Sequence, residues 1–282
     1  MPPGEKRTFR SGDFPGRAVG KGGRMAFVQA LFAEYWPRWQ DRFSSEARML
    51  LGGVPLFALS AGADTRLPDV AGQYLSEDEL RRWSRFVREK RRVEWLGGRL
   101  AAKWAAAGLL GETTVDWQDL VVRTEEDGRP YLESETKAAA PFISISHSGP
   151  MVAALAANLP CGLDIQQPGA KIHTVRKCFA FPEEEDILSG SLPDSFPETE
   201  RLTMLWAAKE AVRKMVRVSP LLGLREIRLQ AGHGGLGVPA DPLALTFASG
   251  RAQDGCPPII SVLCFFADNL AWAMACPVSG TE

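Results

Sequence analysis

One segment of the chain reads Trp206-Ala-Ala-Lys-Glu-Ala-Val-Arg-Lys214, and it carries its only acid, Glu210, one helical turn before Lys214. Residues four apart lie on the same side of a helix, so a carboxylate and an ammonium group are expected to stand together there. An earlier segment, Ala101-Ala-Lys-Trp-Ala105, shares four of five residues with Ala207-Ala-Lys-Glu-Ala211. This short, alanine-rich repeat favours two related halves, of which only the second carries the acid.

Two strands are predicted upstream of this helix. In Gly162-Leu-Asp-Ile-Gln166, alternation sends the leucine and the isoleucine to one face and Asp164 and Gln166 to the other. Before it, Phe142-Ile-Ser-Ile-Ser-His-Ser-Gly149 alternates in the same way and ends at a Ser-Gly-Pro turn. Three polar clusters thus interrupt an otherwise apolar part of the chain.

In order, spacing and identity, these three motifs resemble those of the surfactin-type 4'-phosphopantetheinyl transferases. The resemblance covers about residues 55 to 230, and it includes Tyr74-Leu-Ser-Glu-Asp-Glu and the basic segment from Arg91 to Arg99. It implies an α+β fold in which two similar α+β halves pack about a pseudo-twofold axis, with the active site in the cleft between them. The Arg-Leu-Ala-Ala-Lys and Asp-Ile-Gln segments resemble transferase domains fused to polyketide synthases. We therefore expect a monomer or a domain of a larger synthase.

The two expected halves span residues 25–158 and 159–282, after a leader over residues 1–24 that is rich in Gly, Pro and Arg and is expected to be disordered. Ser76 is the expected N-cap of a helix, and Glu79 completes a capping box. Helices are predicted over residues 27–42, 77–92, 98–110, 182–188 and 198–218. Strands are predicted over residues 119–124, 162–166, 224–230, 243–248, 259–267 and 270–276, the last of them closing the sheet, and a hairpin is predicted over 141–157.

Composition excludes several classes of protein. A net charge of -1 with 24% charged residues argues against general nucleic-acid binding. Residues 81–103 nevertheless hold nine Lys or Arg against two Glu, so we expect an anionic group to dock there. Five cysteines without a CxxC pair predict neither a disulfide framework nor a zinc site. The opening residues do not resemble a secretory signal and the apolar run over 26–36 is too short to span a membrane, so a cytoplasmic protein is expected.

The resemblance implies a Mg²⁺ ion bound by Asp164 and Glu210 and bridged to the diphosphate of coenzyme A. Mg²⁺ prefers one or two carboxylates, with phosphate oxygens and water completing its shell. Gln166 stands where the fullest family pattern has a second strand acid, so an amide oxygen or a water must substitute. Without the resemblance, Asp164 would be interpreted as a helix cap or an arginine partner, and Glu210 as a solvated partner of Lys214.

The resemblance also assigns side chains to the phosphates of coenzyme A. Ser146 and His147 would contact them from the hairpin tip, and Lys214 would hold a phosphate. Lys209 falls in the apolar stripe of its helix, where a charge is costly unless paired, so we expect its ammonium group beside Asp164, Glu210 and the phosphates. The other predicted cofactor-binding residues are Arg92, Arg99, Lys103 and Arg129. The simpler alternatives are a structural histidine at a strand end, solvated charges along the basic run, and a lysine at the rim of the core in the case of Lys209.

The resemblance implies transfer of the 4'-phosphopantetheine arm of coenzyme A to a serine hydroxyl of an acyl or peptidyl carrier protein, in fatty acid or polyketide biosynthesis. Adenosine 3',5'-bisphosphate would be released. The expected catalytic residues are Asp164, Glu210 and Lys214: Glu210 accepts the serine proton, directly or through a metal-bound water, and Lys214 stabilises or protonates the leaving phosphate. Because carrier proteins are typically acidic, Arg213 and Arg217 are expected to contact the partner.

Two other functions compete with this prediction. One is a coenzyme A-binding protein that has lost the transfer activity, for which Gln166 is the hint. The other is a metal-dependent phosphohydrolase, but two-metal hydrolysis needs more clustered carboxylates and histidines than this chain offers.

Overall fold

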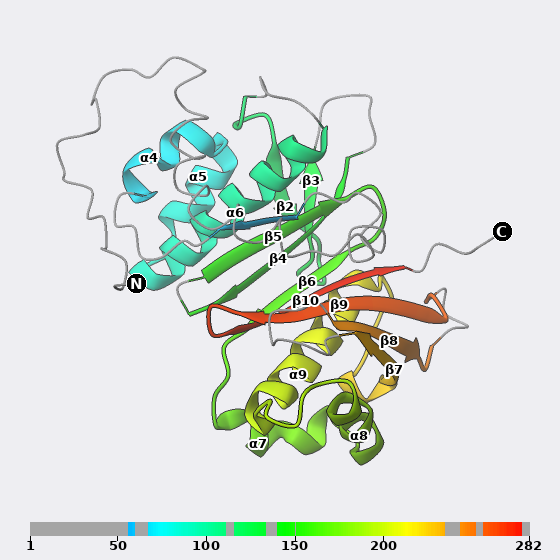
Figure 1. The fold of residues 1–282 in the computed structure, drawn as a ribbon. Coiled ribbons are helices and arrows are strands. Elements are labelled where there is room, and N and C mark those ends of the chain that lie inside the picture. Colours follow the sequence, from blue (N-terminus) through cyan, green and yellow to red (C-terminus); the bar gives the residue numbers. More distant parts are fainter. Residues whose placement is uncertain are drawn as a thin grey trace, which may run out of the picture.

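The protein folds into two α+β halves whose sheets pack face to face, with one long helix on the outer side of each sheet (Figure 1). The computed structural model describes residues 56–59, 67–110, 116–133, 140–149, 151–234, 243–251 and 256–277. The predicted leader over 1–24 and the helix predicted over 27–42 lie outside these residues.

The N-terminal half builds a three-stranded antiparallel sheet in the order β1-β5-β4, beside a separate β2-β3 hairpin. Its helices are α4 (Leu67–Tyr74), α5 (Glu77–Ser84) and α6 (Glu89–Leu110). Its strands are β1 (Leu56–Leu59), β2 (Val121–Thr124), β3 (Pro130–Glu133), β4 (Phe142–Ser148) and β5 (Met151–Ala157).

The C-terminal half builds a five-stranded antiparallel sheet in the order β6-β10-β9-β8-β7. The last strand was expected to close the sheet, but it lies inside it, because β10 forms a hairpin with β9 and pairs along its other edge with β6. The strands are β6 (Gly162–Gln166), β7 (Ile227–Gly234), β8 (Leu243–Ser249), β9 (Ile259–Ala267) and β10 (Leu270–Pro277). The helices are α7 (Lys171–Val175), α8 (Pro182–Gly190) and α9 (Glu198–Met215), with 3-10 turns at Arg176–Cys178 and Leu224–Glu226. The predicted boundary at residues 158/159 falls in the connection between β5 and β6.

The single helix predicted over residues 77–92 is wrong, because the chain breaks between α5 and α6. The indole N–H of Trp83 donates to the carbonyl of Arg92 at 3.1 Å, and the ring of Phe86 lies 5.7 Å from that of Trp95. The break thus folds α5 back against α6. The predicted capping box at Ser76 is confirmed.

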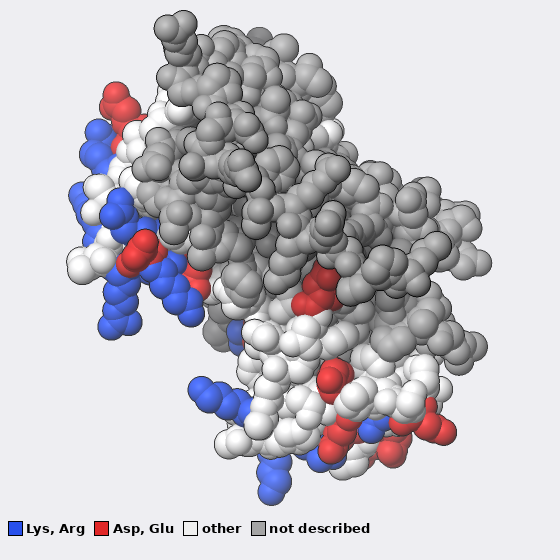
Figure 2. Space-filling model, turned by 60° about the vertical axis from the view of Figure 1, so that its left-hand side comes forward, with Lys and Arg blue, Asp and Glu red and all other residues white. Residues whose placement is uncertain are grey.

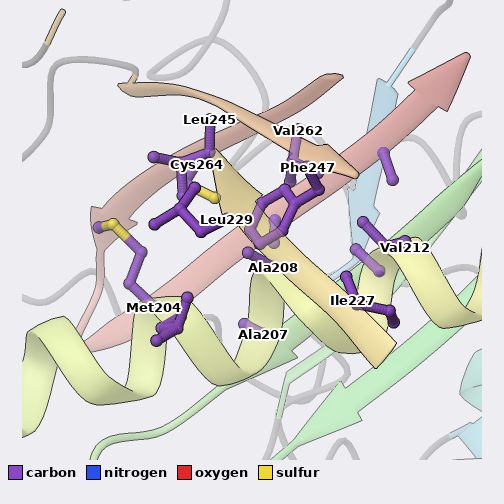
Figure 3. Packing of buried hydrophobic residues seen from close by; sticks show 14 of the residues in the cluster. Met204, Ala207, Ala208, Val212, Ile227, Leu229, Leu245, Phe247, Val262 and Cys264 are labelled. Atoms are coloured by element: carbon purple, nitrogen blue, oxygen red, sulfur yellow. The ribbon is translucent and has the colours of Figure 1, made fainter. Parts of the chain in front are cut away.

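Three apolar clusters hold these layers together. One lies between α6 and the three-stranded sheet, a second between the two sheets, and a third between α9 and the five-stranded sheet. Figure 3 shows the third, in which small α9 residues let the helix approach the apolar side chains of the strands. Its labelled residues include Ala207, Ala208, Val212, Leu229, Leu245, Phe247 and Val262.

A fully buried lysine on α6 joins the elements of the first half. The Nζ atom of Lys103 donates to the carbonyls of Tyr74 at 2.6 Å and Trp117 at 2.8 Å, and to Glu79 Oε2 at 2.6 Å. The other oxygen of Glu79 accepts the backbone N–H of Val122 in β2. A charge taken out of water needs such a complete set of partners.

The second half repeats this arrangement on α9. The Nζ atom of Lys209 donates to the carbonyl of Phe179 at 2.6 Å and to Glu184 Oε2 at 2.8 Å, and Glu184 Oε1 accepts the N–H of Leu229 in β7. As in the first half, the glutamate belongs to the first turn of a short helix and lies five residues after the aromatic residue whose carbonyl the lysine contacts. The predicted α+β fold with two similar halves is confirmed.

Candidate active site

A cavity of about 220 Å³ lies between the two halves. The N-terminal half contributes residues 127–130 of the β2-β3 turn and residues 142–145 of β4. The C-terminal half contributes Pro160, Cys161 and the end of α9, including Glu210 and Lys214. Apolar and charged side chains therefore share one cavity at the junction of the halves.

Asp164 lies at the junction of β4, β6 and α9. The predicted alternation of β6 is confirmed, because Leu163 and Ile165 join the cluster between the sheets while the side chain of Asp164 turns to α9. Its Oδ1 atom accepts hydrogen bonds from Lys214 Nζ and Ser146 Oγ, both at 2.8 Å. The carboxylate is 7% exposed and is held by charge-assisted hydrogen bonds.

Lys214 connects the cavity wall to this carboxylate. Besides Asp164, its Nζ atom donates to the carbonyl of Leu163 at 2.9 Å and to that of Ile145 at 3.3 Å. These acceptors belong to both halves, so the ammonium group also joins β4 to β6. Its side chain remains partly exposed in the cavity, at 30%.

Glu210 lines the cavity one turn before Lys214, but its ion pair is with Arg213, at 2.8 Å. The interpretation of Glu210 as a solvated partner of Lys214 is wrong, because its side chain is only 12% exposed and Lys214 pairs with Asp164. Burial raises the pKa of Glu210; Arg213 opposes the shift, the charge of Asp164 adds to it, and Lys214 opposes it. The two carboxylates therefore lie close enough to repel each other.

This pair of carboxylates suits a hard divalent cation, which would relieve their repulsion. Among the residues that the structure describes, no three His, Cys, Asp or Glu side chains gather into a metal site. A Mg²⁺ ion would therefore depend on Asp164, Glu210 and oxygens of a bound phosphate, which is a common shell for this ion. Gln166 follows on the same face of β6, and its amide N–H donates to the carbonyl of Gln167 at 3.3 Å.

Ser146 and His147 do not face one ligand together. Alternation along β4 buries Ser146 against β6 and leaves His147 exposed on the opposite face. The hydroxyl of Ser146 donates to Asp164 and accepts the N–H of Ile165 at 3.1 Å. The only proton of Ser146 is thus used by Asp164 in this structure, and a contact from its hydroxyl to a phosphate stays a prediction. His147 stays a predicted contact.

The prediction that Lys103 and Lys209 bind the cofactor is wrong. Both side chains are fully buried and contact Glu79 and Glu184 inside their own halves. Burial lowers the pKa of both ammonium groups, and the neighbouring glutamates oppose that shift. The two glutamates are the structural residues that sequence analysis missed, although each occupies the third position of a short helix and marks the internal repeat.

Two arginines of α6 remain suited to an anion. Arg92 stacks over Trp83 at 4.2 Å and Arg99 over Trp95 at 4.3 Å. Their Nε atoms are buried and find no hydrogen-bond acceptor within the described part of the chain. Arg99 is 8% exposed, donates to Thr124 at 3.2 Å, and has its pKa lowered by burial to about 10. Figure 2 shows further Lys and Arg side chains gathered over α5 and the start of α6.

Three further arginines lie at the cavity. Arg129 lines it from the β2-β3 turn, and its guanidinium donates to the carbonyl of Val218 in the other half at 3.3 Å. Arg213 is paired with Glu210, and Arg217 with Glu125. Arg129 and Arg217 thus contact the opposite half, whereas Arg213 pairs within α9, and their contacts to the cofactor and the partner stay predictions.

Comparison with known proteins identifies the family. No protein-family model matches the chain. A holo-(acyl-carrier-protein) synthase from Anoxybacillus flavithermus is 33% identical over 106 residues, which are 36% of this chain and 88% of that relative. The chain belongs to the holo-(acyl-carrier-protein) synthase family. It is an enzyme of the 4'-phosphopantetheinyl transferase class, as the motifs predicted.

Other relatives agree with this family. The holo-(acyl-carrier-protein) synthase of Shouchella clausii is 33% identical over 112 residues, which are 38% of this chain and 95% of the relative. A solved synthase of this name from Bacillus anthracis, in complex with CoA (3',5'-ADP), is 24% identical and covers 37% of this chain and 95% of its own, with a TM-score of 0.33. Within the described residues, no helix has the length and apolar character needed to cross a membrane.

Proposed function

We propose that this member of the holo-(acyl-carrier-protein) synthase family transfers the 4'-phosphopantetheine arm of coenzyme A to a serine hydroxyl of an acyl or peptidyl carrier protein. The reaction would depend on Mg²⁺ and release adenosine 3',5'-bisphosphate. The observation that carries this proposal is the convergence of Asp164, Glu210 and Lys214 beside one cavity. Asp164 lies in β6 and the other two residues lie in α9, with α7 and α8 between them in the sequence. The fold therefore brings the three residues together.

The transfer is a displacement at phosphorus. The carrier serine oxygen forms a bond to the phosphorus of the arm, while the bond from that phosphorus to the adenosine bisphosphate oxygen breaks. Glu210 accepts the serine proton, and the raised pKa of its buried carboxyl makes it a better base than an exposed glutamate. Lys214 stabilises the charge that develops on the leaving phosphate. Mg²⁺, when bound between Asp164 and Glu210, supplies charge neutralisation for the diphosphate.

Coenzyme A would enter the cavity between the halves. Arg129 and Lys214 line it and are the proposed contacts to the phosphates, together with the more distant His147. Arg92 and Arg99 are proposed to bind a phosphate of the cofactor, because their buried Nε atoms have no acceptor among the described residues.

The carrier protein is proposed to approach along the C-terminal end of α9. Arg213 and Arg217 line the cavity there, beside Leu221, which is 44% exposed. An acidic carrier would meet both positive charge and apolar surface at the entrance.

The finer assignment to the surfactin-type subclass rests on the internal repeat. About a third of this chain matches nearly the whole of a relative, and both halves contain the same buried lysine–glutamate pair. One chain thus supplies two halves, which suits a monomer or a domain of a larger synthase. Association with polyketide or fatty acid biosynthesis and a cytoplasmic location are part of the same proposal.

Intact mass spectrometry of a carrier protein tests this function. The enzyme is incubated with coenzyme A, Mg²⁺ and an apo carrier, and we expect each carrier to gain the mass of one phosphopantetheine arm. The gain should disappear when EDTA removes the metal. A panel of fatty-acid, polyketide and peptide carriers would then identify the preferred partner.

A different outcome would favour the competing function. If no carrier gains mass while coenzyme A still raises the melting temperature, the chain binds the cofactor without transferring its arm.

A further inference from the structure

Three serines alternate along β4 and contact the backbone of β6. The hydroxyl oxygen of Ser144 accepts the N–H of Leu163 at 2.9 Å, and that of Ser146 accepts the N–H of Ile165 at 3.1 Å. The hydroxyl oxygen of Ser148 accepts the N–H of Gln167, the residue after β6, at 2.9 Å. All three serines are at most 8% exposed. We call this set the serine ladder.

The serine ladder gives hydrogen-bond acceptors to N–H groups on an edge of β6 that pairs with no other strand among the described residues. β4 is an edge strand of the first sheet and β6 an edge strand of the second, and the two do not pair through their backbones. Buried N–H groups left without an acceptor are costly. The hydroxyl oxygens of β4 therefore take the place of a neighbouring strand and join the two halves.

The middle residue of the ladder does more than its neighbours. Among the described hydrogen bonds of the three serines, that of Ser146 to Asp164 is the one to a side chain, whereas Ser144 and Ser148 contact the backbone of Leu163 and Gln167. A serine hydroxyl has one proton and two acceptor positions, so Ser146 can serve Asp164 and Ile165 together. The hydrogen bond from Ile165 thus holds the hydroxyl of Ser146 in place, and this hydroxyl in turn orients the carboxylate of Asp164.

The two carboxylate oxygens of Asp164 have different surroundings. Oδ1 of Asp164 receives both Ser146 and Lys214, while Oδ2 has no hydrogen bond or ion pair with a described residue. We propose that Ser146 is a positioning residue, which acts through Asp164 and leaves Oδ2 to bind the divalent ion. This inference rests on the proposed metal site, and it gives Ser146 a role other than a direct contact to the cofactor.

Metal affinity, measured without a carrier, tests the proposal. Binding of Mn²⁺ to the protein with coenzyme A present would be followed by titration calorimetry for the wild type, Ser146→Ala and Ser148→Ala. Both substitutions remove one contact of the serine ladder, so both should lower the melting temperature, Ser146→Ala by more because it also removes the hydrogen bond to Asp164. Only Ser146→Ala should weaken Mn²⁺ binding, by about 10- to 100-fold, as substitutions next to metal ligands typically do.

A second pair of variants at position 146 distinguishes the effect of the hydroxyl group from the effect of side-chain size. Ser146→Thr retains the hydroxyl and Ser146→Val replaces it by a methyl group of similar size. Threonine should bind Mn²⁺ more tightly than valine by about 10-fold or more. If threonine and valine bind equally, or if Ser148→Ala weakens binding as much as Ser146→Ala, the positioning role is wrong.

Failure of the underlying metal site would look different. In that case Asp164→Asn would bind Mn²⁺ as tightly as the wild type, or the wild type would not bind it. Either result overturns the metal assignment itself, and this inference with it. Weakened binding in Asp164→Asn together with unchanged binding in Ser146→Ala would overturn only the inference.

Discussion

Replacing Glu210 by glutamine is expected to lower the rate of carrier loading by about 10²- to 10⁴-fold, the usual contribution of a general base. The amide has nearly the same shape but cannot accept the serine proton, and it is a weaker ligand for a divalent cation than a carboxylate. The measurement is the initial rate of carrier mass gain at saturating coenzyme A and Mg²⁺.

The same substitution should leave the fold as stable as before or more stable. The folded-state pKa of Glu210 is raised, so the folded chain holds this proton more tightly than the unfolded chain does. Stability linked to this group is therefore present at low pH and is lost as the pH rises through the folded-state pKa. At neutral pH the ionised group opposes folding, and glutamine removes that opposition.

Glu200→Gln provides the matched control, because it makes the same change near the start of α9 and away from the cavity. Its loading rate should stay within about twofold of the wild type, since substitutions remote from such features usually have small effects. Near-native loading by Glu210→Gln would contradict its assigned role. A large fall in the melting temperature of Glu210→Gln would contradict the inference that the ionised carboxylate of Glu210 opposes folding at neutral pH.

The second large effect is expected on stability, from Gly162→Ala. A Cβ atom at Gly162 would lie 1.8 Å from the carbonyl oxygen of Ala211 and 2.8 Å from the backbone nitrogen of Met215. These are backbone atoms of α9, so the helix itself would have to move. We expect a loss of about 3 kcal/mol or more and a fall in melting temperature on the order of 5–10 °C.

Carrier loading should fall in the same variant, because α9 carries Glu210 and Lys214 while β6 carries Asp164. Gly169→Ala is the control, since nothing lies within 4 Å of a Cβ at that position. Thermal unfolding and loading rates would be measured for both. A Gly162→Ala protein with unchanged melting temperature would show that α9 does not pack on β6 as closely as described.

The alternation of residues predicted which face of a strand each side chain occupies, but not which side chain from another element it contacts there. The alternation in β6 placed Asp164 on the side away from the sheet interface, and this is what the structure shows. Alternation in β4 likewise separates Ser146 from His147, although the motif predicts that both contact one ligand. A motif shared with a family names residues together, whereas backbone geometry decides whether they point the same way.

The two buried lysines depart furthest from what the sequence predicts. Lys103 and Lys209 lie in motif positions beside functional residues, and each has its acid 24 or 25 residues upstream on another helix. Nothing in the local pattern distinguishes a lysine that contacts a phosphate from one that neutralises a buried glutamate. The break between α5 and α6 was missed for a similar reason, because it depends on Trp83 reaching back to Arg92.

The central claim is that Asp164 and Glu210 share one divalent ion at the junction of the two halves. Anomalous diffraction from crystals grown with Mn²⁺ and coenzyme A tests it most directly. We predict one anomalous peak bonded to oxygens of both carboxylates, with Arg213 moved away from Glu210. A peak that touches neither carboxylate, or coenzyme A bound with Glu210 still paired to Arg213 and no metal beside it, would contradict the account.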